Sequence, residues 1–528
     1  MLHWQVAGQA GVTFVYCKII LFMRLNRYSV FLLVTFFSIS GMAQQVIYSE
    51  PDRADVRQTN FEILGKVGGN ILIYKNLRDV HNMAVYDASM NLVDKIKYNF
   101  MPDRVINTDF LTYPDFSYMF YQYQKKNFVY CMAVKIDGSG KKVGDPIILD
   151  TTGINFWTSN KLYSVLNSED KQLINVVKIN TKNDETHIVT TILLNKNLVM
   201  QGRQVLQVNM PDKNDYLTEF QLDNRGNLVF ARTVQGGPDD RVQKLILYVK
   251  PYGNDLVSVT NVDLNENYLD DLRIKPDNTT NRYIITSFYT KSRQGNIDGL
   301  FVAVLNNNSS TLTTKTLLKF DDNLRNDARG ENSFKTALND YFIKNIIPKK
   351  DGGFLLAAEA FFTTGRGGLN RNSYMYGSPF LRPSDFYMFS PYGSGYPWYR
   401  FNNFNSNQLN RYHAQNIMVM SFDSTGHTDW SNMIIKSQWD DESDASIGYQ
   451  LVNTGDQLHF LFNMQEKRTQ LLSDQSIKPD GQLVRNPTLK NLDKGYDFMP
   501  RYGKQIGLRQ IIIPCMLRNF LCFARVEL

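Results

Sequence analysis

The sequence predicts an all-β protein built from a repeated unit of four strands. The chain of 528 residues is 13% aromatic, with 29 Tyr and 33 Phe, and aromatic residues favour strands. Short apolar segments alternate with turns rich in Asp, Asn and Gly along most of its length. These turns form two interleaved series whose members recur about every 50 to 58 residues, which is the signature of a repeat protein.

The first series of turns closes each unit. Its members follow segments such as Met83–Tyr86 and Met132–Ile136. They lie near residues 87, 137, 195, 253, 307, 423 and 480. The step between 307 and 423 is doubled, because a long insertion interrupts the period there.

The second series opens an inner hairpin within each unit. Each member precedes an apolar strand, such as Asn227–Phe230. The members are Gly68–Gly69, Pro114–Asp115, Glu169–Asp170, Arg225–Gly226, Asp277–Asn278, Asp351–Gly352, Gly455–Asp456 and Gly507. Two turn series at one spacing imply four strands per unit.

Four-stranded units of this length that repeat head to tail are typical of propeller blades. Across about 460 residues the chain resembles the β-propeller superfamily, and it is similar to exported propeller-like proteins of Gram-negative bacteria without an assigned activity. We expect one propeller with eight blades. Tyr496–Leu528 supplies only three strands, so Gln45–Ser49 would complete the last blade and close the ring. Seven blades remain the alternative, if one unit is a decorated blade.

The N-terminus has the layout of a signal peptide. A short basic start at Met23–Arg27 precedes an apolar stretch at 28–39, and small residues at Gly41 and Ala43 precede a cleavage site at Gln44. We therefore expect 1–22 to be an over-long gene start, 23–43 a signal peptide and 44–528 the propeller. A transmembrane helix is the alternative, but about 20 apolar residues could be reached only through basic residues.

This leader predicts a periplasmic or extracellular protein with no integral membrane segment after cleavage. Composition supports a folded domain, because 43% of residues are hydrophobic and 21% are charged. The formal net charge of +7 falls by three when Lys18, Arg24 and Arg27 are removed. With so small an excess and no basic run, we do not expect nucleic acid as a partner.

The insertion at 363–413 is the most unusual segment. It holds 13 aromatic residues, five Arg, no Lys and one acidic residue, Asp385. Aromatic residues and Arg in place of Lys and Glu are typical of interface cores. We interpret the segment as an arm that binds a protein or glycan, with six candidate residues: Tyr396, Trp398, Tyr399, Arg400, Arg382 and Phe386. The alternatives are an arm folded against its own propeller and a disordered loop.

Carboxylates recur where inner strands begin, which on a propeller is the mouth of the channel. They are Asp215, Asp270, Asp271, Asp340 and Asp497. Clustered carboxylates could bind Ca²⁺ or act as an acid/base pair on a glycan. The competing interpretation is that each Asp accepts hydrogen bonds within its own turn.

Ser421–Trp430 resembles the Asp-box turn of sialidase-type propellers, with one extra residue before Gly426 and one before Trp430. In that family the box is a structural turn, so the resemblance implies no catalytic residue. The histidines share no metal-ligand spacing, and neither a nucleophile elbow nor a phosphate loop occurs. We therefore expect no metal, no cofactor and no catalytic motif.

Three cysteines follow the predicted cleavage site: Cys131, Cys515 and Cys522. An odd number in an exported protein leaves at least one thiol unpaired. If Arg518–Asn519 is a two-residue turn, Cys515 and Cys522 lie opposite each other on two strands. Pairing and buried free thiols both remain open at this point.

These observations favour an exported, non-catalytic binding or scaffold protein. A propeller-type glycan-active enzyme that uses the channel carboxylates is the first alternative. A structural component of the cell envelope is the second.

Overall fold

The computed structural model describes residues 45–528, except 53–58, 155–160, 184, 213–214, 236–240, 255, 329–337, 365–410, 442–443, 467–468 and 488–494. The predicted over-long start (1–22) and signal peptide (23–43) lie outside the described residues. The chain separates into two compact units, Met1–Gln45 and Val46–Leu528, and the second is described here.

Val46–Leu528 is a succession of antiparallel sheets in which the strands mostly follow chain order. Three four-stranded sheets come first. They contain β2 (Thr59–Val67), β3 (Asn70–Leu77), β4 (Val80–Tyr86) and β5 (Leu92–Lys97); β6 (Asn107–Thr112), β7 (Phe116–Lys125), β8 (Phe128–Asp137) and β9 (Lys142–Gly153); and β10 (Tyr163–Asn167), β11 (Leu173–Asn183), β12 (Thr186–Asn195) and β13 (Met200–Asn209).

The next sheet has eight strands and consists of two four-stranded meanders that join at one pair, Val242 opposite Leu269. The first meander contains β14 (Asp215–Leu222), β15 (Leu228–Gln235), β16 (Val242–Lys250) and β17 (Ser258–Val262), and the second contains β18 (Tyr268–Asp277), β19 (Arg282–Thr290), β20 (Gly299–Asn306) and β21 (Leu312–Lys319). A short helix, α2 (Asp322–Ala328), follows.

Three further sheets complete the described fold. They contain β22 (Tyr341–Pro348), β23 (Phe354–Thr364), β24 (Arg411–Phe422), β25 (Thr428–Ile434) and β26 (Gln438–Asp440); β27 (Tyr449–Asn453), β28 (Leu458–Glu466), β29 (Thr469–Ile477) and β30 (Leu483–Arg485); and β31 (Tyr496–Phe498), β32 (Lys504–Gln505), β33 (Gln510–Leu517), β34 (Phe520–Glu527) and β1 (Gln45–Tyr48). A 3₁₀ turn, η4 (Pro500–Tyr502), lies between β31 and β32.

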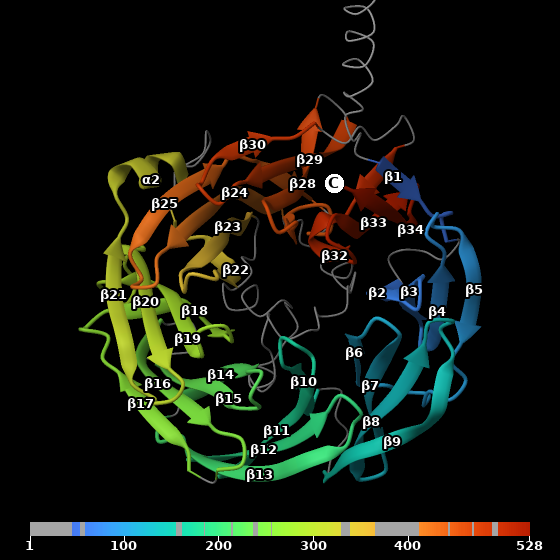
Figure 1. The fold of residues 1–528 in the computed structure, drawn as a ribbon, viewed down its shortest axis with the longest axis horizontal. Helices are drawn as coiled ribbons and strands as arrows, with labels where there is room; N and C mark the ends of the chain where they lie inside the picture. The colour runs from blue at the N-terminus through green and yellow to red at the C-terminus, as the bar shows by residue number, and fades with distance from the viewer. Residues whose placement is uncertain are drawn as a thin grey trace, which may run out of the picture. The chain divides into compact units, whose positions relative to one another are not determined.

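This arrangement is all-β and propeller-like, as the sequence predicts. Within Val46–Leu528, Figure 1 shows the first strands of the sheets, such as β2, β6 and β14, nearest a common centre, with β5, β9 and β13 outermost. First strands of successive four-stranded units contact each other, among them β14 with β18 and β18 with β22. Both predicted turn series fall between strands, the first between third and fourth strands and the second between first and second.

The core lies between consecutive sheets. Leu72 and Tyr74 of β3 pack with Phe110 and Met119 of the next sheet in one buried cluster. Because each face of a sheet meets a neighbour, the third strands are apolar on both faces; in β20 seven of the eight positions are buried. The last sheet also packs on the first, since Phe523 lies in one cluster with Phe61 and Ile73.

The N-terminal strand β1 lies beside β34, where the sequence placed it. The backbone N–H of Ser49 donates to the carbonyl of Phe523 at 2.8 Å. The N–H of Phe523 in turn donates to Ser49 Oγ at 3.0 Å. These bonds occupy backbone groups that an edge strand would leave open.

Four first strands are bulged. The register of β2, β14, β18 and β22 shifts after Ile63, Thr218, Asp270 and Ile343, respectively. Glu219 and Asp271 adopt left-handed conformations at two of these bulges, with φ of 56° and 63°. Bulges re-aim side chains and often lie beside functional sites. At two of them a carboxylate reaches the neighbouring first strand, since Glu219 accepts from the backbone of Ile274 and Asp271 from that of Ile343.

Candidate functional site

Asp215 begins β14 and is held by its own turn and by an arginine. Its side chain is buried, and its Oδ2 accepts a hydrogen bond from the backbone of Asp212 at 3.0 Å. Arg232 Nη2 lies 2.9 Å from the same oxygen. The turn-capping interpretation from the sequence therefore describes Asp215 well.

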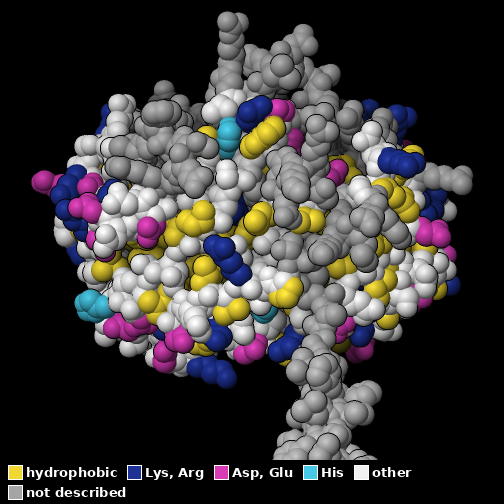
Figure 2. Space-filling model, turned by 90° about the horizontal axis from the view of Figure 1, so that it is seen from above, with side chains coloured by type: hydrophobic (Ala, Val, Ile, Leu, Met, Phe, Trp, Pro, Cys, Tyr) yellow, Lys and Arg dark blue, Asp and Glu magenta, His cyan; other side chains and the backbone are white. Residues whose placement is uncertain are grey.

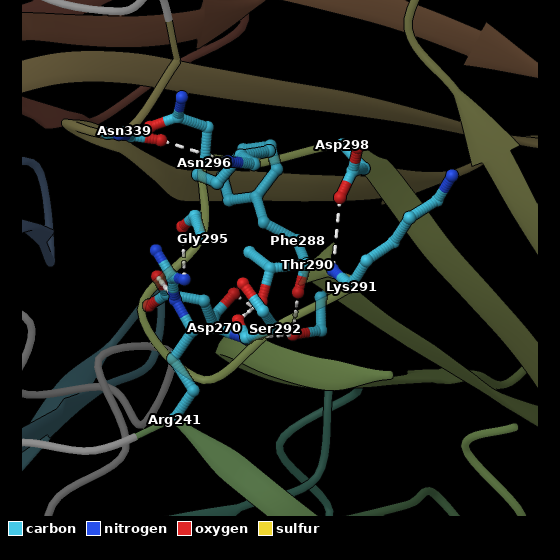
Figure 3. A network of polar contacts seen from close by, with 12 residues as sticks. Arg241, Asp270, Phe288, Thr290, Lys291, Ser292, Gly295, Asn296, Asp298 and Asn339 are labelled. Carbon is cyan, nitrogen blue, oxygen red and sulfur yellow. Dashed lines mark hydrogen bonds and ion pairs between the residues drawn. The ribbon is translucent and has the colours of Figure 1, made fainter. Parts of the chain in front are cut away.

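Asp270 is part of a polar network that fixes the loop between β19 and β20. Figure 3 shows Arg241 pointing toward both Asp270 and Gly295, and Arg241 Nε lies 3.0 Å from Asp270 Oδ2. The Arg241 guanidinium also donates to the carbonyl of Gly295. Asn339 Oδ1 accepts from the backbone of Ile297 at 2.9 Å, on the far side of the loop. This carboxylate therefore has a structural partner that positions a surface loop.

Asp271 belongs to a buried charge group that joins three first strands. Arg273 lies between two carboxylates, with Nη2 at 2.6 Å from Asp271 Oδ1 and Nη1 at 3.3 Å from Glu219 Oε1. The backbone of Ile343 on β22 donates to Asp271 Oδ2, and that of Ile274 donates to Glu219 Oε2 at 3.0 Å. Burial raises the pKa of Glu219 to about 7, although the charge of Arg273 acts against this rise.

Sequence reasoning missed Glu219 and Arg273. Glu219 follows Leu217 and Thr218 in a segment that resembles a plain strand, and only the bulge turns its side chain inward. No local residue pattern marks this bulge, because Glu219 takes a left-handed conformation that glycine usually occupies.

The other two candidate carboxylates are less enclosed. Asp340 precedes β22 and its carbonyl accepts from the backbone of Phe361 at 2.8 Å. Asp497 lies on β31 and is exposed. Its pKa is raised, first because nearby protein partly desolvates it and second because Asp440 carries the same charge. Asp440 itself accepts from Ser446 Oγ at 2.5 Å.

The five candidates are thus distributed over several strands. Asp270 and Asp271 are neighbours on β18, whereas Asp215, Asp340 and Asp497 lie on or before three other first strands. Among the described residues, no group of three or more His, Cys, Asp or Glu side chains is placed to hold a metal ion.

A second charge group links β22, β23 and the segment between β25 and β26. Glu359 is buried, and its Oε1 lies 2.9 Å from Lys436 Nζ. Its Oε2 lies 3.6 Å from Lys344 Nζ, and Lys344 follows the bulge at Ile343. Burial, and next the nearby charge of Arg501, lower the pKa of Lys344 to about 8. Sequence reasoning did not single out these lysines, since each lies in an ordinary strand or loop context.

The insertion leaves from a regular two-stranded stem. Thr364 at the end of β23 is paired with Arg411 at the start of β24, and Phe362 is paired with His413. The rings of Phe362 and His413 stack at 4.5 Å between centroids. The hydroxyl of Thr364 lies 3.0 Å from His413 Nε2. Thr364 and Arg411, the described residues that flank 365–410, are therefore held side by side.

A third strand, β26, supports this stem. Asp440 of β26 is paired with Tyr412, and Trp439 with His413. Arg411 makes two contacts with Asp441, from Nε at 2.6 Å and from Nη2 at 3.0 Å. Its guanidinium lies 4.2 Å from the centroid of Trp439, a side chain that is 49% exposed. An exposed Trp with a stacked Arg is the side-chain pair typical of binding hot spots.

The stem and Asp340 lie at the same end of their sheet. Tyr341, which follows Asp340, is paired with Ala360, only a few residues before the insertion leaves β23. The six candidate arm residues, Tyr396, Trp398, Tyr399, Arg400, Arg382 and Phe386, lie outside the described residues.

The outer surface carries charges of both signs. Figure 2 shows Lys and Arg side chains interspersed with Asp and Glu on the visible side, and scattered apolar side chains between them. No helix within the described residues is long and apolar enough to cross a membrane.

No protein-family model matches this chain, and no curated protein matches it. Weak likenesses to solved structures exist. One is a polysaccharide lyase, an ulvan lyase, with TM-score 0.35, 10% identity and coverage of 79% of this chain and 90% of that chain. Another is prolyl oligopeptidase B from Galerina marginata, with TM-score 0.39 and 8% identity; the match covers 89% of this chain and 56% of that chain. A third is an apocarotenoid oxygenase from Synechocystis, with TM-score 0.32 and 8% identity; the match covers 93% of this chain and 94% of that chain. At such scores we draw no function from any of them.

Proposed function

We propose that this chain is an exported, non-catalytic binding or scaffold protein. It would be a single propeller of eight blades closed by β1, located in the periplasm or outside a Gram-negative cell. Its arm, 363–413, and the surrounding face would engage a protein or a glycan of the cell envelope.

The sheet topology supports eight blades. The eight-stranded sheet is two meanders joined at a single pair, so it counts as two blades. The meander that starts at β22 and the one that starts at β27 keep the same order of four strands. Packing of Phe523 with Phe61 and Ile73 supports a contact between last and first blades.

The stem is the observation that carries the binding proposal. A long insertion with loose ends would lose much conformational entropy on binding, whereas fixed ends reduce that loss. Here the pairing of Thr364 with Arg411 fixes both ends, and β26 supports them. The aromatic and Arg-rich composition of the insertion supplies residues suited to an interface.

The test compares partner recovery with folding stability. In a pull-down from the native envelope, Trp398→Ala and Arg400→Ala should each weaken recovery of the partner at least tenfold, because truncating an anchor typically costs about 2 kcal/mol or more. The melting temperature should stay within about 1 °C of wild type, since surface changes usually cost under about 0.5 kcal/mol.

Phe128→Ala is the matched control, because it removes an aromatic side chain of similar exposure, 49%, from a different sheet. A lowered melting temperature for Trp398→Ala with unchanged recovery would instead indicate an arm folded on its own propeller. Wild-type recovery and stability in both arm variants would overturn the binding proposal.

A glycan-active enzyme is the second candidate, and Asp497 is the observation that favours it. A general acid needs a raised pKa, and the pKa of Asp497 is shifted in that direction, first by partial desolvation and second by the charge of Asp440. Asp497→Asn and Asp440→Asn should each abolish release of new reducing ends from envelope polysaccharides. An absence of such release by the wild-type protein would remove this candidate.

A further inference from the structure

The last hairpin carries two cysteines that face each other. Arg518 and Asn519 form its turn, and both have positive φ, 49° and 70°, as a two-residue type I′ turn requires. The register continues without a shift, so that Cys515 is opposite Cys522. Their Sγ atoms lie 3.0 Å apart, and Cys522 Sγ lies 3.2 Å from the carbonyl of Cys515.

The backbone geometry at this pair is compatible with a disulfide. Counting from the turn, the Leu517–Phe520 pair is hydrogen-bonded, so the Cys515–Cys522 pair is hydrogen-bonded too. Cα atoms of such pairs are about 5.5 Å apart, inside the range that disulfides span, while their side chains lie farther apart than those of a non-hydrogen-bonded pair. Since bonded sulfur atoms are about 2 Å apart, the two sulfurs need to approach by only about 1 Å.

We propose that Cys515 and Cys522 are an oxidation site at which a cross-strand disulfide forms in the last hairpin. The oxidant is a small-molecule or protein disulfide, which acts by thiol–disulfide exchange. One cysteine thiolate attacks the oxidant, forms a mixed disulfide and releases one thiolate. The second cysteine thiolate attacks the mixed disulfide, which forms the Cys515–Cys522 bond and releases the second thiolate. The two protons lost by the cysteines end on the two released thiols.

The surroundings indicate a structural bond formed during folding. Both thiols are fully buried in the cluster that also contains Tyr496 and, from the N-terminal strand, Tyr48. Burial raises the pKa of Cys515 well above its usual value, so little thiolate forms in the folded protein. The hairpin therefore exchanges readily before it is covered, and once covered the bond is shielded from reductants.

Cys131 provides an internal control. It is equally buried, and its pKa is also raised by burial. Its register partners on β7 and β9 are Gln122 and Asp150, so no thiol lies opposite it. Oxidation of the hairpin should therefore leave Cys131 as a free thiol.

Trypsin separates the two cysteines, which makes the bond directly measurable. Cleavage after Arg509, Arg518 and Arg525 places Cys515 and Cys522 on different peptides. The full chain is produced with an export leader in an oxidising compartment and, separately, in a reducing one. Each sample is unfolded, alkylated without reductant, digested and analysed by mass spectrometry.

We expect the oxidised sample to contain the two peptides as one linked species, lighter by two hydrogens than their sum, in most molecules. The reducing sample should contain both peptides alkylated, and Cys131 should be alkylated in both samples. Unfolding the oxidised wild type, reducing it and refolding it in dithiothreitol should lower its melting temperature by about 3 °C, because the bond restricts the unfolded chain. The same treatment should not affect Cys515→Ser or Cys522→Ser.

Cys131→Ser should keep both the linked peptide and the response to dithiothreitol. Mostly alkylated Cys515 and Cys522 in the oxidised sample would overturn the proposal and leave a buried pair of free thiols. The mass-spectrometric result decides this even if a serine variant fails to fold.

Discussion

At the scale of single residues, burial decides which carboxylates can take part in chemistry. Asp215 and Asp270 each have an arginine within 3.0 Å, so each is engaged in an ion pair. Glu219 differs because its burial outweighs the effect of Arg273, which also contacts Asp271. Asp215 and Asp270 are therefore held by structural partners, which makes them poor candidates for contact with a substrate.

The raised pKa of Glu219 predicts a pH dependence of stability. In the folded state its pKa is about 7, against 4.5 for an unperturbed Glu. Between these values the folded protein retains a proton that the unfolded chain has released. The free energy of unfolding therefore falls as pH rises from about 4.5 to about 7, by about 3 kcal/mol at most.

Glu219→Gln should remove this loss. The variant should match wild type near pH 4.5 and become more stable above pH 7, since Arg273 still pairs with Asp271 at 2.6 Å. Urea unfolding across this pH range measures the effect. Exposed Glu266→Gln is the control and should keep the wild-type slope. If the free energy of unfolding of Glu219→Gln fell with pH as steeply as that of wild type, Glu219 would be ionised in the folded protein.

At the scale of elements, turns were predictable and bulges were not. Asp137 illustrates the first case, because its Oδ1 accepts from the backbones of Ser139 and Lys141 at 2.9 and 3.0 Å. This local bonding needs particular residues at fixed offsets, so the sequence reveals it. The bulge at Glu219 depends on contacts with β18, which is far from it in sequence, and the stem of the insertion depends on the pairing of β24 with β26. Such distant partners leave no local pattern.

Gly140 and Gly144 lie in the same sheet and allow the cost of backbone strain to be compared with the cost of steric crowding. Gly140 closes the turn between β8 and β9 with φ of 77°, and an added Cβ would lie 2.8 Å from Val85 Cγ2 and 2.9 Å from Ile96 Cδ1. Gly144 has a similar φ of 75°, but an added Cβ would meet nothing within 4 Å.

Gly144→Ala should therefore cost about 1 kcal/mol, the penalty for a left-handed alanine. Gly140→Ala should cost about 3 kcal/mol, because the methyl group also crowds the neighbouring sheet. Chemical denaturation of both variants gives the comparison. If both variants lost the same free energy of unfolding, the two sheets would not be tightly packed at this turn.

At the scale of the whole molecule, the repeat was predictable because every unit has to bury the same two apolar faces. A lone four-stranded sheet exposes two apolar faces, so each unit repeats the same strands and turns, and the spacing becomes visible in the sequence. The sequence indicates the function less clearly than it indicates the fold. The Asp candidates were chosen because Asp recurs where inner strands begin. A residue that recurs in every unit usually serves the fold, as the hydrogen bond and ion pair of Asp215 illustrate. The insertion stood out because it interrupts the period and its composition differs from that of the rest of the chain.

The N-terminal strand joins the two ends of the domain. Val46 and Tyr48 pack against the last sheet, and Asp52 extends this link to the first sheet through Lys75, whose Nζ lies 3.2 Å from Asp52 Oδ2. If the sheets form a closed ring, each depends on both neighbours, so a break at this point should weaken the whole domain rather than one sheet.

Deletion of Gln44–Glu50 should therefore lower the melting temperature of one cooperative transition. The loss should be about 3 kcal/mol or more, because three partly buried apolar side chains and the pairing with β34 disappear together. The matched control replaces the exposed Val199, Met200 and Val205 by Ser, which removes equal numbers of apolar side chains at 56%, 57% and 62% exposure. This control should change stability little. A deletion that leaves the melting temperature unchanged, or that splits the transition in two, would show that the ends fold independently and that β1 does not close a ring.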